Sequence, residues 1–238
     1  DTVAAREAQA DAYQPLPEHF AEHLAALKFF GDRRAVPGAG VGVAVPRDTV
    51  WLEAIALRPD LVKRLTQAAA RNAAKVAEMM ARIGLRYLMG GGDFASKNGP
   101  FYSPRAFHEI MLPALKQVSD ACHAAGAYHM FASDGDLWPV ADDLFGESGV
   151  DCFYEIDRRC GMDLRLLRER FPRLTLMGGI ASETLHLGTP EQVKEETRSA
   201  LQVASELGGI IVGCSNQIVP PTPMENFWAM MDVLTNER

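Results

Sequence analysis

Apolar and polar residues alternate along this chain with two different periods, which predict different elements. Residues 59–83 carry apolar side chains at helical spacing, which predicts a long amphipathic helix with Pro59 in its first turn and Gly84 past its end. Shorter apolar runs bounded by Gly, Ser and Asp are typical of buried strands. These runs predict six strands, over residues 39–45, 85–89, 127–132, 150–156, 174–177 and 210–212.

Helical spacing also recurs before and between the predicted strands. The segments are residues 18–30, 49–56, 103–123, 137–147, 163–171, 190–207 and 223–234. Ser103 and Pro104 are suited to the cap and first turn of the third segment, and Pro113 is expected to bend it. Strands separated by helices in this way predict βαβ units and a parallel sheet.

The expected fold class is α/β, a TIM-type (β/α) barrel in a single domain over residues 1–238, with the weaker pattern in residues 1–84. A doubly wound sheet gives the same alternation, but the chain has neither G-x-G-x-x-G nor G-x-x-x-x-G-K-[ST], the phosphate loops of nucleotide folds. A complete barrel has eight strands in ~250 residues. Six strands, in a chain that begins at Asp1 without Met, predict a barrel that is incomplete at its amino end.

Composition narrows the classes of function. Hydrophobic residues make up 47% and charged residues 23%, as in ordinary globular domains. A net charge of −7 without a Lys/Arg block argues against a nucleic-acid partner. The four cysteines have no C-x-x-C pair, so neither a disulfide framework nor a zinc ribbon is indicated. No apolar run approaches the roughly 18 residues of a membrane span and no signal peptide opens the chain, so the expected location is the cytoplasm.

The carboxyl ends of the predicted strands carry the residues that could perform chemistry, because these ends meet at one mouth of a parallel barrel. The residues are Asp93, Ser133, Asp134, Asp136, Glu155, Asp157, Gly178, Gly179, Cys214, Ser215 and Asn216. Several carboxylates around one pocket raise at least one pKa, which suits acid–base work or cation binding. Each acid also fits a helix cap or a rim salt bridge, and Asp134-Gly135 is a common turn dipeptide.

Cysteine and histidine give a weaker signal. Cys214 directly follows the last predicted strand, where a thiolate could act as nucleophile or metal ligand, although buried cysteines are usually inert apolar residues. His129 lies within a predicted strand and is expected in the core. The other histidines fall on predicted helices or their flanks, so a zinc site of several His and Cys is not indicated.

Residues 131–136, Phe-Ala-Ser-Asp-Gly-Asp, resemble the strand-end signature of the uroporphyrinogen decarboxylase superfamily. Residues 103–107 with Pro113 resemble its "SP..F…P" helix, and residues 218–226 resemble its "I.P.TP.EN" close. Further matches in order are residues 161–164, 177–180 and 187–189. Together the matches cover about residues 85–234.

The resemblance implies a TIM-type barrel and one of two activities. One is decarboxylation of uroporphyrinogen without a cofactor, in tetrapyrrole (porphyrin) biosynthesis. The other is methyl transfer between a corrinoid protein and a thiol that zinc activates. The decarboxylases' amino-terminal arginine pair and aspartate have no counterpart here, and Cys214 stands where their Gly-His-Gly close has histidine. The methyltransferases' His-x-Cys is replaced by Ala132 and Asp134, whereas Cys214 matches their later zinc-binding Cys.

The resemblance favours methyl transfer at the barrel mouth, with a corrinoid as methyl carrier and a thiol as acceptor. The alternatives are decarboxylation of uroporphyrinogen or a related carboxylated substrate, and a non-catalytic ligand-binding member. Expected catalytic residues, which are also the expected ligands of a zinc ion, are Asp134, Glu155 and Cys214. Expected substrate contacts are Asp93, Ser133, Asp136, Gly179, Ser215 and Asn216.

The same reasoning gives the expected partners. They are a small-molecule or tetrapyrrole substrate, a corrinoid protein and, because unpaired strands at the edges of an incomplete barrel favour association, a second copy of the chain. Neither a nucleic acid nor a membrane is expected as a partner.

Overall fold

The strands of this protein form one parallel sheet that is wound in the order of the sequence. The computed structural model describes residues 2–237. Its six-stranded sheet has the order β1 (Pro37–Ala39), β2 (Tyr87–Gly91), β5 (Tyr128–Ala132), β6 (Cys152–Tyr154), β7 (Thr175–Ile180) and β8 (Ile210–Cys214). Each strand is parallel to its neighbour in this order. The order never reverses, so the sheet is wound like a TIM-type barrel and not like a doubly wound sheet.

Helices follow the strands and cover the sheet. They are α1 (Thr2–Ala12), α2 (Ala21–Phe30), α3 (Thr49–Leu57), α4 (Pro59–Arg82), α5 (Pro104–Ala106), α6 (Leu112–Ala124), α7 (Leu164–Arg170), α8 (Ser182–Leu187), α9 (Pro190–Leu207) and α10 (Met224–Asn236). A short antiparallel hairpin, β3 (Ala95–Ser96) and β4 (Gly99–Pro100), follows β2. None of the helices in the described part of the chain is long and apolar enough to span a membrane.

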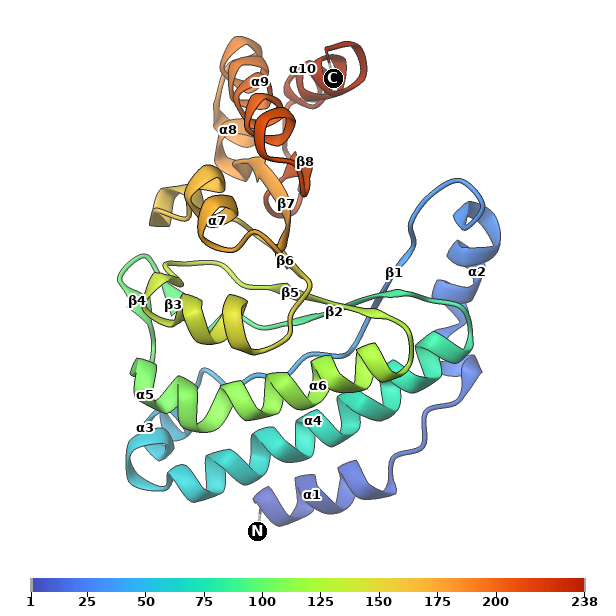
Figure 1. Ribbon diagram of the computed structural model, residues 1–238, viewed down its shortest axis with the longest axis vertical. Helices are drawn as coiled ribbons and strands as arrows, with labels where there is room; N and C mark the ends of the chain where they lie inside the picture. Colours follow the sequence, from blue (N-terminus) through green and yellow to red (C-terminus); the bar gives the residue numbers. More distant parts are fainter. Residues whose placement is uncertain (1, 238) are drawn as a thin grey trace.

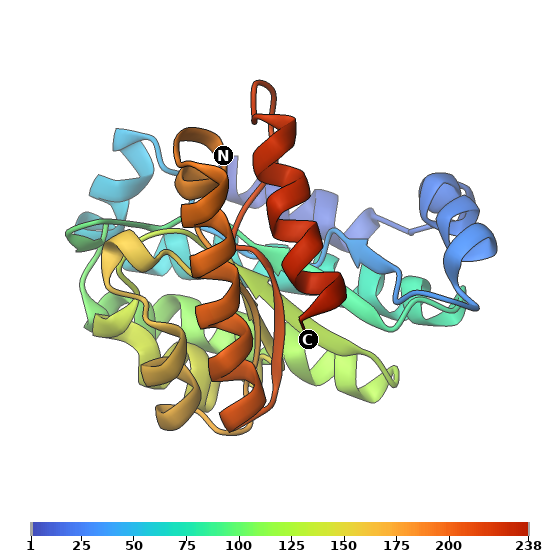
Figure 2. The same ribbon diagram turned by 90° about the horizontal axis from the view of Figure 1, so that it is seen from above.

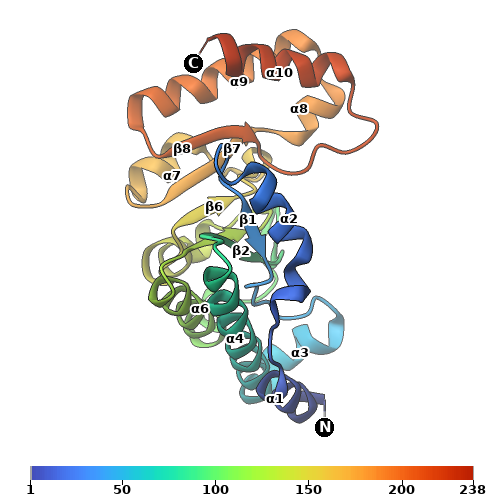
Figure 3. The same cartoon turned by 90° about the vertical axis from the view of Figure 1, so that its right-hand side faces the viewer.

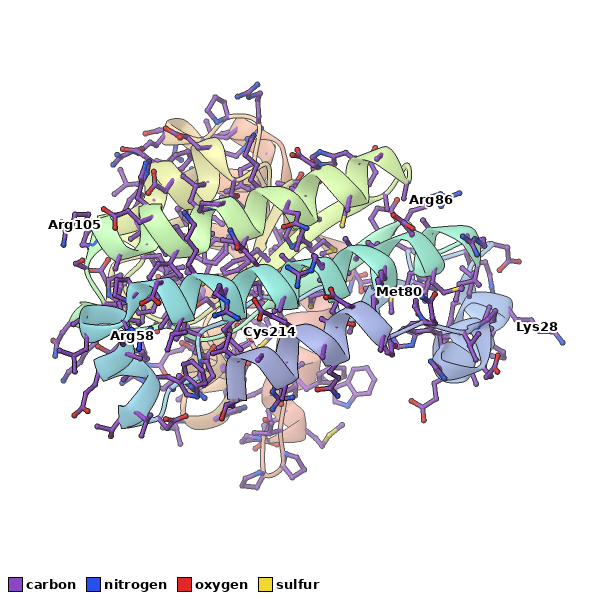
Figure 4. The ribbon with its side chains drawn as sticks, turned by 90° about the horizontal axis from the view of Figure 1, so that it is seen from below. Lys28, Arg58, Met80, Arg86, Arg105 and Cys214 are labelled. Carbon is purple, nitrogen blue, oxygen red and sulfur yellow. The ribbon has the colours of Figure 1, made fainter. Side chains whose placement is uncertain are left out.

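The helices gather into two groups on the outside of the sheet. Helices α4 and α6 lie along β1, β2 and β5, while α8, α9 and α10 lie beside β7 and β8 (Figure 1). Seen from above, α9 and α10 run next to each other (Figure 2). The side view places the strands between the two groups (Figure 3), and the view from below shows α1 resting against α4 (Figure 4). Within residues 2–237, β1 and β8 form the two edges of the sheet.

The core lies between the sheet and these helices. On β5, His129 and Phe131 are both fully buried on the helix side, whereas Tyr128 on the opposite face is 54% exposed. The ring of Phe131 lies 6.4 Å from that of Phe94, which contacts Phe107 at 5.3 Å. The side chains of β5 that face the helices are thus buried, and Met130 on the opposite face is also only 5% exposed, so this strand shows no strict alternation of buried and exposed positions.

The first strand lies earlier in the chain than predicted, because β1 covers Pro37–Ala39 and overlaps the predicted residues 39–45 at Ala39 alone. Only Pro37–Ala39 pairs with β2. The Gly40 N–H still donates to the Met89 carbonyl, but the residues after Gly40 form no strand pairing. Residues 41–45 still alternate, because Val41, Val43 and Val45 are buried while the residues between them are small and face a hollow. The pattern therefore predicted the buried face correctly and the pairing incorrectly.

Two predicted helices contain wider turns. Ser103 caps its helix as predicted, with its hydroxyl accepting from the Ala106 N–H at 3.2 Å. A π-helical turn over Phe107–Met111 precedes Pro113, which has no N–H for a regular helical ladder. Residues 137–147 form a 3₁₀ turn and then a π-helical turn over Asp142–Glu147, instead of one regular helix. The other long predicted helices are confirmed to within a few residues of their ends, while α8 and the β3–β4 hairpin were not predicted.

A buried histidine predicts acid sensitivity. His129 is fully buried and its Nδ1 lies 2.8 Å from the Ser119 hydroxyl, while its Nε2 has no partner among the described atoms. Burial lowers its pKa to about 4, opposed by the negative charge of Asp151. An unfolded histidine titrates near 6.5, so the unfolded chain binds more protons as the pH falls from about 6.5 to about 4, and stability is lost across that window.

We expect this residue to cost about 2 kcal/mol of unfolding free energy between pH 7 and pH 5. Urea unfolding of the wild type and of His129→Leu at both pH values measures it. Between pH 7 and pH 5, the unfolding free energy of His129→Leu should fall by about 2 kcal/mol less than that of the wild type. Equal losses in the two proteins would contradict this role of His129.

Candidate functional site

Three carboxylates from three different strand ends meet at the mouth of the curved sheet. Asp93 follows β2, Asp134 follows β5 and Glu155 directly follows β6. Carboxylate oxygens of the three lie within 4.8 Å of one another. We call these residues the acidic cluster. The sequence pattern predicted that the three residues share a mouth, and the structure brings them together.

The backbone at Glu155 directs its side chain into this mouth. Among the described residues, Glu155 is the non-glycine residue with a positive φ, at 73°. This left-handed conformation costs a residue with a side chain on the order of 1 kcal/mol and is often found at functional sites. Neighbouring parallel strands lie about 4.8 Å apart. The turn of the backbone at Glu155 therefore brings its carboxyl close to the carboxyls that follow the adjacent strands.

Two residues of the acidic cluster, Asp93 and Glu155, line a hollow of about 600 Å³. Its wall is made mainly of small residues, namely Gly40, Gly42, Ala44, Gly90, Gly91 and Gly92, with Asp93 and Glu155 among its polar groups. Gly91 cannot be replaced easily, because a Cβ there would lie 2.1 Å from the Ala132 carbonyl oxygen and its φ is +135°. The hollow therefore has a wall of backbone, with carboxylates at its mouth.

Two carboxylates of this site, those of Glu155 and Asp134, hold protons more strongly than isolated ones. Burial, followed by the charges of Asp134 and Asp93, raises the pKa of Glu155 to about 7. Burial also raises the pKa of Asp134, although hydrogen bonds from Asn216 oppose this. At the rim, Arg47 Nη1 lies 3.1 Å from Asp93 Oδ2 in an exposed ion pair. A carboxyl that titrates near neutral pH is suited to accepting and returning a proton.

Asn216 and Tyr154 hold Asp134 in place. The Asn216 amide donates to both carboxylate oxygens of Asp134, at 3.1 and 3.0 Å. The Tyr154 hydroxyl in turn donates to the Asn216 carbonyl at 2.9 Å. Asp134 and Asn216 also line a smaller cavity of about 220 Å³. Asn216, predicted as a substrate contact, is thus engaged by the protein itself.

The remaining predicted residues make structural contacts. The Ser133 hydroxyl, which is buried, donates to the Asp134 carbonyl at 3.1 Å. The Ser215 hydroxyl accepts from the Gly179 N–H at 2.9 Å and thereby joins β7 to the end of β8. Asp136 accepts from the Trp138 N–H at 3.0 Å, which is the turn-capping contact that its sequence position also fits.

Asp157 and Gly178 complete the predicted set. Asp157 caps a short 3₁₀ turn by accepting from the Arg159 N–H at 3.1 Å, and its other oxygen lies 2.9 Å from the Cys160 sulfur. Gly178 packs against Ser215, where a Cβ would lie 3.0 Å from the hydroxyl. Asp157 therefore shapes the loop after β6, whereas Gly178 lies within β7 and not after its end as predicted.

Cys214 lies apart from the acidic cluster. Its sulfur is 3.4 Å from the Ser182 hydroxyl, and Val212 and Cys214 both pack against the apolar cluster under α8, α9 and α10. Gly213, between them, faces the opposite side of the strand, where an added Cβ would meet no atom within 4 Å. In the described part of the chain, the side chains that lie close enough together to share a cation are those of Asp93, Asp134 and Glu155. Asp93 thus takes the place that the prediction gave to Cys214. All three of its ligands are oxygen atoms, which suit hard cations such as Mg²⁺ or Mn²⁺.

Sequence reasoning missed Arg47 and Tyr154. Arg47 belongs to the segment after the misassigned first strand, so its distance from Asp93 could not be judged from the pattern. Tyr154 looked like one of several apolar residues in the β6 run. Phe153, the residue before it, is fully buried against the helices. Because successive residues of a strand point to opposite faces, Tyr154 faces the inner side of the curved sheet.

Comparisons with known proteins bear on the family and the fold of this chain. No curated protein matches the sequence. Among solved structures, a methyltransferase from Methanosarcina mazei is similar, with a TM-score of 0.69 and 21% identity over 88% of this chain. The match covers 61% of that methyltransferase, so the present chain spans about three fifths of its length. Residues 47–236 match the family described as uroporphyrinogen decarboxylase (URO-D), and the chain belongs to this family.

Proposed function

We propose that this chain is a methyltransferase that moves a methyl group from a corrinoid carrier to a thiol at the mouth of its sheet. The observation that carries the proposal is the Glu155 carboxyl, which borders the hollow beside Asp134 and Asp93. A methyltransferase of similar fold supports the class of reaction. The chemistry of the acidic cluster supports the thiol as acceptor.

Methyl transfer to a thiol releases one proton. The acceptor's sulfur forms a bond to the methyl carbon, the bond from the carbon to its carrier breaks, and the S–H proton needs a base. Glu155, with a pKa of about 7, is suited to take that proton, and the neighbouring carboxylates strengthen it as a base. The corrinoid would supply an electrophilic methyl group, and the carboxyl of this chain would receive the proton.

Charge at the mouth favours this reaction over decarboxylation of a polycarboxylate. Each arginine lining the two described cavities already has a carboxylate partner: Arg47 pairs with Asp93, Arg158 with Glu196 and Arg159 with Glu183, at 2.9 to 3.1 Å. The acidic cluster adds further negative charge. A substrate with several carboxylates would be repelled there, whereas an uncharged or cationic substrate would not.

The zinc site implied by the resemblance does not fit these residues. Zinc that activates a thiol is usually held by Cys or His, and the acidic cluster offers oxygen atoms alone. Cys214, the matching cysteine, packs toward the helices. The proposed reaction therefore uses Glu155 as the base and requires no zinc ligand from Cys214.

The experiment mixes the purified chain with methylcobalamin and 2-mercaptoethanol and follows thioether formation by mass spectrometry. A parallel reaction with uroporphyrinogen follows carbon dioxide release. Thioether formation faster than in the protein-free control supports the proposal. Carbon dioxide release without thioether formation would replace it with the decarboxylase alternative, and neither product would support a ligand-binding member.

The charge of the acceptor gives a sharper prediction. Three thiols that share the 2-mercaptoethyl group are compared: uncharged 2-mercaptoethanol, cationic cysteamine and anionic 2-mercaptoethanesulfonate. We expect kcat/KM for the anionic thiol to be at least about fivefold below that for 2-mercaptoethanol, because one like-charge contact at 4 Å costs about 1 kcal/mol even in water. The difference should shrink as salt is added. An anionic thiol that reacts as fast as the neutral one at low salt would contradict the proposed charge of the mouth.

A further inference from the structure

One amide side chain connects strand ends that are far apart in the sheet. Asn216 lies just after β8 and bonds to Asp134, just after β5, although two strands, β6 and β7, separate them. In a flat sheet, strands three places apart are roughly 14 Å from each other. Contacts of about 3 Å between their ends therefore depend on the curvature of the sheet and on the loop after β8.

The orientation of the Asn216 amide is fixed by its own partners. Its Oδ1 accepts from the Gln217 N–H at 2.6 Å, so the amino group is the end that faces Asp134. Its main-chain carbonyl accepts from the Tyr154 hydroxyl at 2.9 Å, and Tyr154 is the last residue of β6. The ends of β5, β6 and β8 are thus joined through a single residue.

We infer that Asn216 is a positioning residue, which holds the Asp134 carboxylate beside Glu155 and does not itself bind substrate. Both Asp134 oxygens receive its amide N–H groups, which fixes the plane and the distance of the carboxylate. Two hydrogen bonds to one carboxylate give the geometric precision that a catalytic constellation requires. Tyr154 supports the arrangement by holding the backbone of Asn216.

This role makes a kinetic prediction that differs from substrate binding. Without Asn216, the Asp134 carboxylate loses its fixed position, so the reacting groups would be misplaced. Small misplacements cost up to roughly 100-fold in rate. A positioning residue should change kcat with little change in KM, whereas a substrate contact should raise KM.

The test compares Asn216→Ala and Tyr154→Phe with Asn236→Ala in thioether formation from methylcobalamin and 2-mercaptoethanol. Asn236 is a matched control, because its amide also donates to an aspartate, Asp232, at 2.9 Å, but on the exposed face of α10. We expect Asn216→Ala to lower kcat by about 10- to 100-fold with KM changed less than about twofold. Tyr154→Phe should show a smaller loss of the same kind, and Asn236→Ala should leave both constants unchanged. A rise in KM at constant kcat for Asn216→Ala would overturn the inference.

This kinetic readout rests on the proposed function, so a second measurement stands apart from it. Urea unfolding midpoints are compared for the wild type, Asn216→Ala, Asp134→Ala and the double variant. If Asn216 holds Asp134, removing its amide should lower the midpoint in the wild type and change it little once Asp134 is absent. Equal decreases in both backgrounds would refute the contact, whether or not the protein transfers methyl groups.

Discussion

Replacing Glu155 with Gln is expected to reduce thioether formation by roughly 10²- to 10⁴-fold, the usual contribution of a general base. The substitution keeps the size of the side chain and its position after β6, but it removes the carboxylate that serves as the base in the proposed reaction. Steady-state rates with methylcobalamin and 2-mercaptoethanol measure the effect. Glu109→Gln, on an exposed helix surface, is the control and should retain the wild-type rate. Wild-type activity in Glu155→Gln would exclude Glu155 as the base.

The pH dependence of the same variant separates a lost base from a misfolded protein. A base must be unprotonated to act, so the wild-type rate should rise with pH through about 7, the pKa of Glu155, and the rise should vanish in Glu155→Gln. Stability should respond in the opposite sense. Because the folded-state pKa lies above the unfolded value of 4.5, the folded wild type loses stability as pH rises between those values. At pH 8 the variant should therefore melt at or above the wild-type temperature.

Phe131→Ala is expected to lower the unfolding free energy by about 3–5 kcal/mol. Phe131 is fully buried on strand β5, and the centre of its ring lies 6.4 Å from that of Phe94. Its removal leaves a cavity that the packed core can only partly fill. Phe29→Ala, at a residue 64% exposed on α2, should change the same quantity by less than about 0.5 kcal/mol. Urea unfolding of both variants measures the difference, and similar losses would place the stabilising core elsewhere.

The elements that could be predicted from the sequence are those whose pattern is local. The long helix after Pro59 and the cap at Ser103 depend on neighbouring residues, and both lie where the pattern placed them. The first strand was placed too late in the chain because an alternation of Val with Gly or Ala indicates a buried face but does not specify a pairing partner. The wide turns before Pro113 and near residue 145 depend on how missing or competing hydrogen bonds are accommodated, which periodicity does not encode.

The candidate site was predictable in outline for a different reason. Parallel strands bring their carboxyl ends together, so Asp134 and Glu155 could be expected to meet from strand positions alone. The directions of side chains could not be derived in the same way. Cys214 packs toward the helices, and Asn216 reaches across the mouth to Asp134. Both outcomes depend on the curvature of the sheet and on the loop after β8, which appear only in three dimensions.

The glycines around the site differ in how much change they would tolerate over evolution. At Gly91, any side chain would collide with the neighbouring backbone, so we expect this position in the wall of the hollow to remain glycine. At Gly213, a side chain would enter open space, and no positive φ penalises it there. Single substitutions at Gly213 could therefore add contacts beside the mouth without disturbing the sheet. A lineage of such enzymes could acquire new substrate preferences by drift at this one strand position, while the acidic cluster and its supports stay the same.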